Sequence, residues 1–236
     1  MNIIRIFCPE SLSLNLTSKL DKSQSHYLTK VMRVKVSENF SLFNERGEWE
    51  AKIKDISKGI VEFNITKQLR QKENIKEIWL AFSPIKSNYF NLMIQKATEL
   101  GVTKFIPILT ERTIVRKINQ KRINKIIVEA CEQSNRLNIP TLENLINLED
   151  FLNNNESMHI IFGDLNSNKK SLDIKNLKNL DAICILIGPE GDFTSNERNN
   201  ILNHKKIYPL KINNNILRSE TAAISMISIV NFNFLS

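Results

Sequence analysis

The sequence predicts an α/β protein with two domains, a small β-barrel over residues 1–70 and a larger parallel-sheet domain over residues 76–236. Three observations lead to this prediction. Short strand-like segments separated by turn residues fill the first part. A charged stretch without apolar periodicity, Leu69–Lys76, follows them. Strand-like segments then alternate with amphipathic helices, which indicates a parallel sheet covered on both faces.

The first part reads mainly as short β-strands. From Trp49 onward, Trp49, Ala51 and Ile53 alternate with charged residues, which is the pattern of a half-buried strand. Only His26–Arg33 predicts a short helix. The expected strands, separated by ERG and SKG turns, are Phe40–Asn44, Trp49–Ile56 and Ile60–Thr66.

The second part alternates strands and helices. A helix is expected from about Ser87, because its apolar residues fall on one face and Gly101 suits its C-cap. Further helices are expected at Gln120–Asn135 and from Ser219. Ligands of such sheets bind beyond the carboxyl ends of the strands. The expected strands are Ile78–Phe82, Lys104–Leu109, His159–Phe162, Ala182–Ile187 and the run Ile207–Ile212.

The charge balance is uneven. The chain has 33 lysines and arginines against 25 aspartates and glutamates, a formal net charge of +8. The excess favours a polyanionic partner and long-range steering toward it. The alternative, that the lysines are merely solvated, fits the charge equally well.

Several classes of protein are disfavoured by the composition. No apolar stretch approaches the roughly 18–20 residues that span a bilayer. The first residues make a poor signal peptide, because Arg5, Pro9 and Glu10 interrupt the apolar run. The cysteines and histidines are scattered without a CxxC pair, so we expect neither a metal site nor a disulfide framework. A cytoplasmic location is the default expectation. They are Cys8, Cys131, Cys184, His26, His159 and His204.

The segment Ile185–Glu197, ILIGPEGDFTSNE, leads from a buried strand into a helix. Gly188 and Gly191 allow a tight turn that brings bare backbone groups near a ligand. Thr194 and Glu197 form the capping-box pattern of the next helix. The pattern is neither a Walker loop nor a GxGxxG fingerprint, and an ordinary strand-to-helix turn is the alternative.

A second segment, Ile216–Ser225, gathers polar groups at the start of the last helix. Ser219 is the expected N-cap, and Glu220 suits the first turn. Arg218 does not fit this interpretation, because a cation is disfavoured at a helix N-terminus unless something anionic is near. Small residues at Ala222 and Ala223 predict tight packing of this helix.

Polar residues in QKATELGV, TERTIVRK and EACEQSNR form a third group. Each alone is more typical of a surface ion pair than of a site, although Arg112 and Arg136 suit phosphate or base recognition through their planar guanidinium groups. The group comprises Glu99, Arg112, Glu129, Gln133 and Arg136.

Taken together and in this order, these segments resemble the RsmE family of 16S ribosomal RNA (uracil-N3) methyltransferases, in the SPOUT superfamily of knotted methyltransferases. The resemblance covers nearly the whole chain. His26–Leu28 with Val31–Arg33 is similar to the family's N-terminal HHL…VLR motif, and Phe43–Ile53 to its barrel hairpin. The spaced pair IGPEGDF and ILRSETA is the most specific part of the match.

The resemblance implies a PUA-like RNA-binding β-barrel followed by a SPOUT-type domain with a deep trefoil knot. It implies S-adenosylmethionine (SAM) as methyl donor, a homodimer, no metal, and a single target, N3 of one uridine of 16S rRNA (uracil 1498 in the usual rRNA numbering) within the small ribosomal subunit. The cofactor-binding residues that it implies are Phe162, Gly163, Ile187, Gly188, Gly191, Ile212, Ile216, Leu217, Thr221 and Ala222.

Catalytic and RNA-binding roles are hypotheses about how the chain would perform the reaction that the resemblance implies. Arg218 is expected to stabilise the developing anionic uracil oxygen, with Arg112 as second candidate, and Glu190 to orient the base or receive the proton. The residues expected to bind RNA are Lys30, Arg33, Lys86, Gln133 and Arg136.

The chain departs from the family pattern in places. Asn213 and Asn215 stand where the family usually has glycine and arginine, and Asp192 follows GPEG where glycine is common. Asn213 suits a left-handed position better than most residues do. Three alternatives remain open: a SPOUT methyltransferase acting on another RNA atom, a non-catalytic RNA-binding protein, and a nucleotide-phosphate enzyme.

Overall fold

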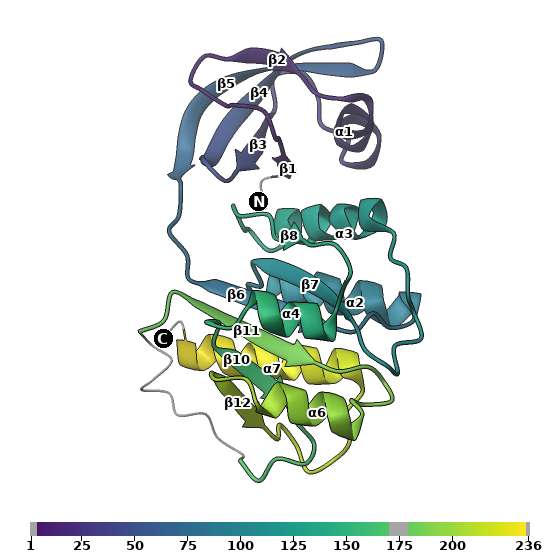
Figure 1. Ribbon diagram of the computed structural model, residues 1–236. Helices are drawn as coiled ribbons and strands as arrows, with labels where there is room; N and C mark the ends of the chain where they lie inside the picture. Colours follow the sequence, from purple (N-terminus) through teal and green to yellow (C-terminus); the bar gives the residue numbers. More distant parts are fainter. Residues whose placement is uncertain (1–3, 170–178, 235–236) are drawn as a thin grey trace. The chain divides into compact units, whose positions relative to one another are not determined.

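The computed structural model describes residues 4–169 and 179–234, and it divides the chain into two compact units (Figure 1). The first unit combines Met1–Asn74 with Cys131–Ile139, and the second combines Ile75–Ala130 with Pro140–Ser236. The segment Cys131–Ile139, which falls within the second domain expected from the sequence, groups with the first unit in the structure.

The first unit is built on a five-stranded sheet in the order β1-β3-β4-β5-β2. β1 pairs with β3 in parallel and the other pairs are antiparallel. Trp49, Ala51 and Ile53 of β4 are buried, as the alternation predicted, and they join the core with Phe40 and Phe63. The strands are β1 (Arg5–Phe7), β2 (Thr17–Lys19), β3 (Asn39–Asn44), β4 (Gly47–Ser57) and β5 (Ile60–Gln71).

The short helix expected at His26–Arg33 differs from the one observed. Helix α1 covers Lys22–His26, because the Asp21 carboxylate accepts a hydrogen bond from the Gln24 backbone N–H and caps it. A π-helical turn, Tyr27–Val31, continues it, and Arg33 then takes a left-handed φ of 57°. A π turn widens the helix by one residue, which apolar spacing alone does not reveal.

The second unit has a parallel sheet in the order β12-β10-β11-β6-β7-β8, with β9 also paired to β7. All five predicted strands of this part are present within two residues at either end. β10 lies between β11 and β12, an order consistent with the knotted topology that the resemblance implies. The strands are β6 (Glu77–Phe82), β7 (Lys104–Leu109), β8 (Thr141–Leu142), β9 (Ile146–Asn147), β10 (Ile160–Gly163), β11 (Ala182–Ile187) and β12 (Ile207–Leu210).

Helices cover both faces of this sheet. Phe151 of α4 and Ile201 of α6 pack on one face, against Phe162 of β10. On the other face α2 contacts α7, and the Phe82 ring of β6 packs at a tilt against the Phe90 ring of α2. These helices are α2 (Ser87–Glu99), α4 (Leu148–Asn154), α6 (Ser195–Leu202) and α7 (Ser219–Phe234). Helix α3 (Gln120–Gln133) begins in this unit, and its last three residues belong to the first unit.

Helix ends follow local chemistry. Thr194 and Glu197 form the predicted capping box of α6, and Gly101 follows α2 with a φ of 97°. α3 ends two residues before the predicted Asn135, because Asn135 is left-handed with a φ of 62°. In the described ranges, 4–169 and 179–234, no helix is both long and apolar enough to cross a membrane.

Candidate active site

Three neighbouring parallel strands end at one cavity in the second unit. β10, β11 and β12 end at Gly163, Ile187 and Leu210, and the loops that follow enclose a volume of about 370 Å³. This is the edge of the sheet where ligands of α/β folds bind. The cavity is lined by residues 163–165, 187–190, 192, 210, 212, 213, 215–220 and 222.

Hydrogen bonds hold these loops together. The Asp164 backbone N–H donates to the Leu210 carbonyl at 3.0 Å, which joins the first loop to the third. The Ser219 hydroxyl donates to the Gly188 carbonyl at 3.1 Å, which joins the second loop to α7. Ser219 had been expected to cap α7; instead the Arg218 carbonyl accepts the Ala222 N–H, so Arg218 occupies that position and the Ser219 side chain serves the cavity wall.

The second loop requires glycine at one position. A Cβ on Gly188 would lie 2.6 Å from the Phe193 ring, closer than real Cβ contacts come. The bare backbone of Gly188 therefore allows Phe193 to close in beneath the loop, and Phe193 in turn stacks edge-on against Phe162 of β10. Phe162 is 1% exposed and supports the cavity from the core, without lining it.

An ion pair that the sequence analysis missed supports the first loop. Asp164, which lines the cavity and is 4% exposed, accepts hydrogen bonds from Arg198 of α6 at 3.0 and 2.8 Å. The hydrogen bond to Asp164 raises the pKa of Arg198. No local pattern marks this pair, because its members lie on different elements far apart in the sequence.

Local hydrogen bonds explain two of the residues that depart from the family pattern, Asp192 and Asn213. Asp192 is left-handed with a φ of 59°, and its side chain accepts a hydrogen bond from the Phe193 N–H at 2.8 Å. This explains how aspartate serves where glycine is common. Asn213 would suit a left-handed position, but its φ is not left-handed here. Its side chain accepts the Asn215 N–H at 3.0 Å and makes a local turn instead.

The three candidate catalytic residues lie in different surroundings. Arg218 is exposed, lines the cavity, and holds its guanidinium carbon 5.1 Å from the centroid of the Tyr89 ring. Glu190 is exposed and lines the cavity as well. Arg112, in contrast, donates to the Gly191 carbonyl at 2.7 Å and is outside the lining, so it holds the loop. Tyr89 was absent from the sequence-based candidates, because an exposed aromatic residue on a helix carries no signal of its own.

Seven of the ten expected cofactor-binding residues line the cavity. The other three are placed differently: Phe162 lies beneath it, Gly191 contacts Arg112, and Thr221 is exposed on α7. Those that line it are Gly163, Ile187, Gly188, Ile212, Ile216, Leu217 and Ala222.

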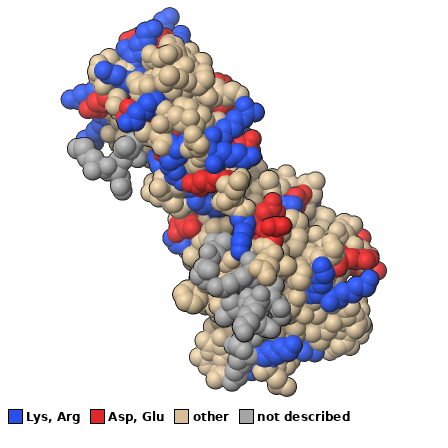
Figure 2. Space-filling model, turned by 90° about the vertical axis from the view of Figure 1, so that its left-hand side faces the viewer, with Lys and Arg blue, Asp and Glu red and all other residues tan. Residues whose placement is uncertain are grey.

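The residues expected to bind RNA are divided between the units. Lys30, Arg33 and Gln133 are exposed in the first unit, and Lys86 is exposed at the start of α2 in the second. Arg136 is only half-buried at the surface of the first unit, and burial lowers the pKa of its guanidinium. On the face drawn in Figure 2, lysine and arginine side chains are spread over the first unit with acidic ones among them.

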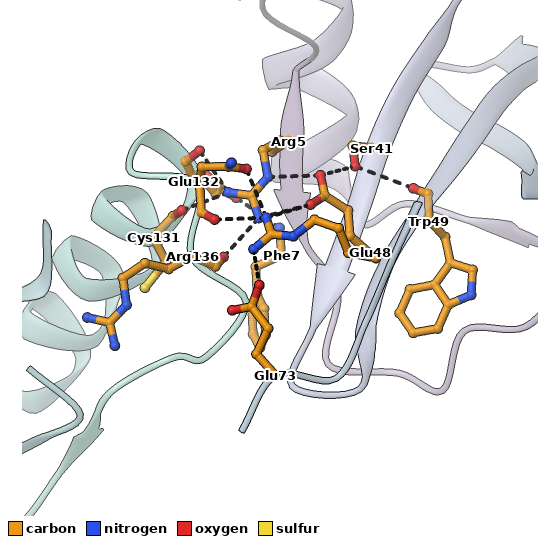
Figure 3. Close-up of polar contacts among 11 residues, drawn as sticks. Arg5, Phe7, Ser41, Glu48, Trp49, Glu73, Cys131, Glu132 and Arg136 are labelled. Carbon is orange, nitrogen blue, oxygen red and sulfur yellow. Dashed lines mark hydrogen bonds and ion pairs between the residues drawn. The ribbon is translucent and has the colours of Figure 1, made fainter. Parts of the chain in front are cut away.

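A network of charged residues builds the segment Cys131–Ile139 into the first unit (Figure 3). Arg5 donates to the carbonyls of Cys131 and Arg136 at 2.9 and 2.8 Å, so it satisfies acceptors at the end of α3. Arg5 also pairs with Glu48 at 2.9 Å. After α3, the Arg136 carbonyl accepts from Arg5, and the carbonyl and side chain of Asn135 accept from Arg70. No local sequence pattern predicts these contacts between distant residues.

Glu48 is the centre of this network. Its side chain is 6% exposed and accepts hydrogen bonds from Ser41, Arg5 and Arg70. Burial by itself raises the pKa of Glu48, but the Ser41 hydrogen bond and the two guanidinium groups outweigh it and hold the pKa below its ordinary value. Glu99 and Glu129, by comparison, form the surface ion pairs that were the simpler expectation, with Lys96 and Lys125.

The cysteines are buried in the core. Burial raises the pKa of Cys131 to about 11 and that of Cys184 to about 12, so both stay protonated thiols at neutral pH. Within the part of the chain that the structure describes, no three His, Cys, Asp or Glu side chains gather as a metal site would require.

Comparisons with known proteins agree with this geometry. A family model described as an RNA methyltransferase domain matches residues 71–231, and one described as an RNA methyltransferase PUA domain matches residues 20–66. A curated relative, ribosomal RNA small subunit methyltransferase E of Rickettsia conorii, is 35% identical over an alignment of 233 residues that covers 97% of this chain and 95% of the relative.

Two solved structures are similar over the whole chain, each with a TM-score of 0.88 and 28% identity. One is the ribosomal RNA small subunit methyltransferase E of Neisseria gonorrhoeae bound to S-adenosyl methionine, with 99% of this chain and 98% of that chain covered. The other is a protein of Legionella pneumophila in complex with the cofactor SAM, with 98% of both chains covered.

Proposed function

We propose below which atom of the RNA is methylated and which residues take part. The premise is that the chain belongs to the ribosomal RNA small subunit methyltransferase E family. It is therefore a SAM-dependent methyltransferase that acts on the RNA of the small ribosomal subunit. The acceptor atom that we propose is N3 of a single uridine of 16S rRNA. The protein then acts on small ribosomal subunits in the cytoplasm.

The charges around the cavity favour SAM over a nucleotide phosphate. Glu190, Asp192 and Glu220 line it together with one arginine, Arg218, while the Asp164 carboxylate is neutralised by Arg198. SAM carries a positive sulfonium and a positive ammonium, which neighbouring carboxylates attract, whereas the phosphates of ATP or NAD would be repelled. This acidic lining is the observation that carries the choice of cofactor.

The apolar part of the cavity suits the rest of the same molecule. Ile187, Ile212 and Leu217 line it beside the bare backbone of Gly163 and Gly188. An adenine ring buries apolar area against such side chains, and glycine backbone lets the polar edge of a ligand approach closely. We assign cofactor binding to this wall.

The reaction needs an accessible base, a bound methyl donor and loss of the N3 proton. N3 lies on the Watson–Crick edge, so the uridine must be unpaired or flipped out when it enters the site. When bound, SAM supplies a methyl group on a positively charged sulfur. Positioning the two reactants against each other supplies much of the rate.

We assign the charge chemistry to two side chains. Arg218 donates hydrogen bonds to a uracil oxygen on which negative charge develops as the proton leaves N3. Glu190 lies on the same cavity wall and orients the base or accepts that proton. Arg112 contributes by holding the Gly191 carbonyl, and thereby the loop that carries Glu190.

The experiment that tests this proposal maps methyl groups in the RNA. Small subunits from a strain without the gene are incubated with the purified protein and SAM, and the RNA is analysed by mass spectrometry. We expect one added methyl group, at N3 of one uridine, which is missing before incubation. A methyl group on another atom would overturn the acceptor assignment, and RNA binding without any methyl transfer would favour the non-catalytic alternative.

We infer that the protein works as a homodimer. The stretch ISMISIV of α7 buries Met226, Ile227 and Val230 within its unit, yet Ile229 is only half-buried and Phe232 is 77% exposed. An apolar surface beyond the needs of one sheet face is typical of a subunit interface. Light scattering at micromolar concentration should give the mass of a dimer; a monomer mass, unchanged by SAM, would contradict this inference.

A further inference from the structure

An aromatic side chain outside the cavity wall contacts the proposed catalytic arginine. Tyr89 lies near the start of α2, is 44% exposed, and has the Arg218 guanidinium carbon 5.1 Å from its ring centroid. We propose that Tyr89 is a positioning residue that holds the Arg218 guanidinium over the cavity through its ring. This inference rests on the proposed function, because it assigns Arg218 to the charge developing on the acceptor base.

Arg218 needs such an anchor. It lies at the N-terminal end of α7, where the helix dipole disfavours a cation. Its side chain is long and exposed, and a mobile guanidinium would have to be ordered anew in each turnover. Within residues 4–169 and 179–234 it has no ion pair, and the contact that the structure gives its guanidinium is the Tyr89 ring.

The ring restrains the guanidinium without consuming its donors. A cation over an aromatic face is attracted by the ring quadrupole, whereas a carboxylate partner would occupy the N–H groups and neutralise the charge. The N–H groups that lie in the plane of Arg218 stay available to an oxygen of the substrate. This is the arrangement that a group acting on a developing charge requires.

The position of Tyr89 does not reflect packing of the core. The buried face of α2 is formed by Phe90, Met93, Ile94 and Ala97. Leu92, one helical turn after Tyr89, is similarly exposed at 43% and carries no aromatic ring. Leu92 therefore provides a matched control for loss of an exposed apolar side chain from the same helix.

The test is a double-mutant cycle in the full-length protein, with the steady-state rate of methylation at varied concentrations of small subunits as the readout. Tyr89→Leu removes the ring and keeps an apolar side chain; we expect kcat to fall roughly three- to thirtyfold, the range of one cation–π contact. Tyr89→Phe should retain most of the parent kcat, because the ring and not the hydroxyl contacts Arg218. Leu92→Ala should leave kcat, SAM affinity and melting temperature as in the parent.

The coupling distinguishes positioning from a structural role. If Tyr89 acts through Arg218, Tyr89→Leu in an Arg218→Ala background should cause little further loss, and the KM for subunits should change less than kcat. Three outcomes would each overturn the inference. The losses in kcat could be additive, Tyr89→Leu could keep the parent kcat, or Tyr89→Phe could be as slow as Tyr89→Leu. Tyr89→Gln gives a second ring-less variant if Tyr89→Leu fails to fold.

The outcome is separable from that of the proposed function. If the parent methylates a different RNA atom, the acceptor assignment fails, yet the coupling between Tyr89 and Arg218 is still measured on that reaction. If the acceptor is N3 of the uridine and the two losses are additive, the inference about Tyr89 fails alone.

Discussion

Arginines in two regions of this molecule each lie over an aromatic ring, but they differ in whether protein acceptors take their hydrogen-bond donors. In the first unit, Arg5 and Arg70 share the carboxylate of Glu48, and Arg5 also donates to backbone carbonyls at the end of α3. At the cavity of the second unit, Arg218 faces an aromatic ring and keeps its donors. An arginine whose donors are satisfied by the protein stabilises the fold, whereas one that only rests on a ring is available to a substrate.

The largest effect that this comparison predicts is on stability. Glu48→Gln leaves Arg5, whose side chain is 8% exposed, without its charged partner, and removing one member of a buried pair costs about 3 kcal/mol. Urea unfolding should show this loss, while kcat at low temperature stays near that of the parent. Glu62→Gln is the control: its side chain is 28% exposed and pairs with Lys54, so we expect a loss below about 1 kcal/mol.

Arg218→Ala should have the converse profile. We expect kcat to fall about a hundredfold or more, as when one transition-state donor is removed, with melting temperature and RNA affinity little changed. Single-turnover methylation and a thermal scan of the same preparation check both parts. Arg122→Ala removes an exposed arginine of the same unit and serves as control. An Arg218→Ala protein that methylates at the parent rate would show that Arg218 does not stabilise the transition state.

Local sequence patterns predicted several strands, helix ends and turns of both units correctly. Alternation in β4, the caps of α2 and α6, and the glycine turn after β11 are local patterns, and each is present in the structure. Polar residues that follow parallel strands must meet at one sheet edge, so the loops around the cavity were predictable as well.

Contacts between distant segments were not predictable. Arg5 with Glu48, Asp164 with Arg198, and Tyr89 with Arg218 each join residues that only the tertiary fold brings together. The π-helical turn at Tyr27–Val31 was missed for another reason, since it keeps the apolar spacing of a short α-helix. α4 was missed because its Asn-rich sequence has low helix propensity.

Acid should lower the free energy of unfolding of the parent through Glu48 of the first unit. The pKa of Glu48 is lower in the folded state than its ordinary value of 4.5, so its contribution to stability is complete above that value. The contribution is lost as the pH falls from that value through the lowered pKa, because over this range the unfolded state binds the proton and the folded state does not. Urea unfolding at pH 7 and at pH 4 should show a smaller acid-induced loss for Glu48→Gln than for the parent; equal losses would contradict the role of Glu48.

The smallest effect concerns RNA binding by the first unit. Arg33 is exposed after the π-helical turn, and we expect it to contact a phosphate. Arg33→Ala should lower the slope of log affinity against log salt by nearly one unit, with kcat at saturating RNA close to that of the parent. Arg33→Lys keeps the charge and should keep the slope. An unchanged slope in Arg33→Ala would remove this residue from the RNA contact.

The central claim is that the acidic, glycine-walled cavity at the ends of β10, β11 and β12 holds SAM, and a ligand-dependent unfolding measurement tests it most directly. At a hundredfold excess over its dissociation constant, SAM should stabilise the parent by about 2.7 kcal/mol, while ATP and NAD give no shift. Gly188→Ala, whose Cβ would collide with Phe193 at 2.6 Å, should fold but lose most of this stabilisation. A shift with ATP, and none with SAM or its demethylated product, would contradict the account.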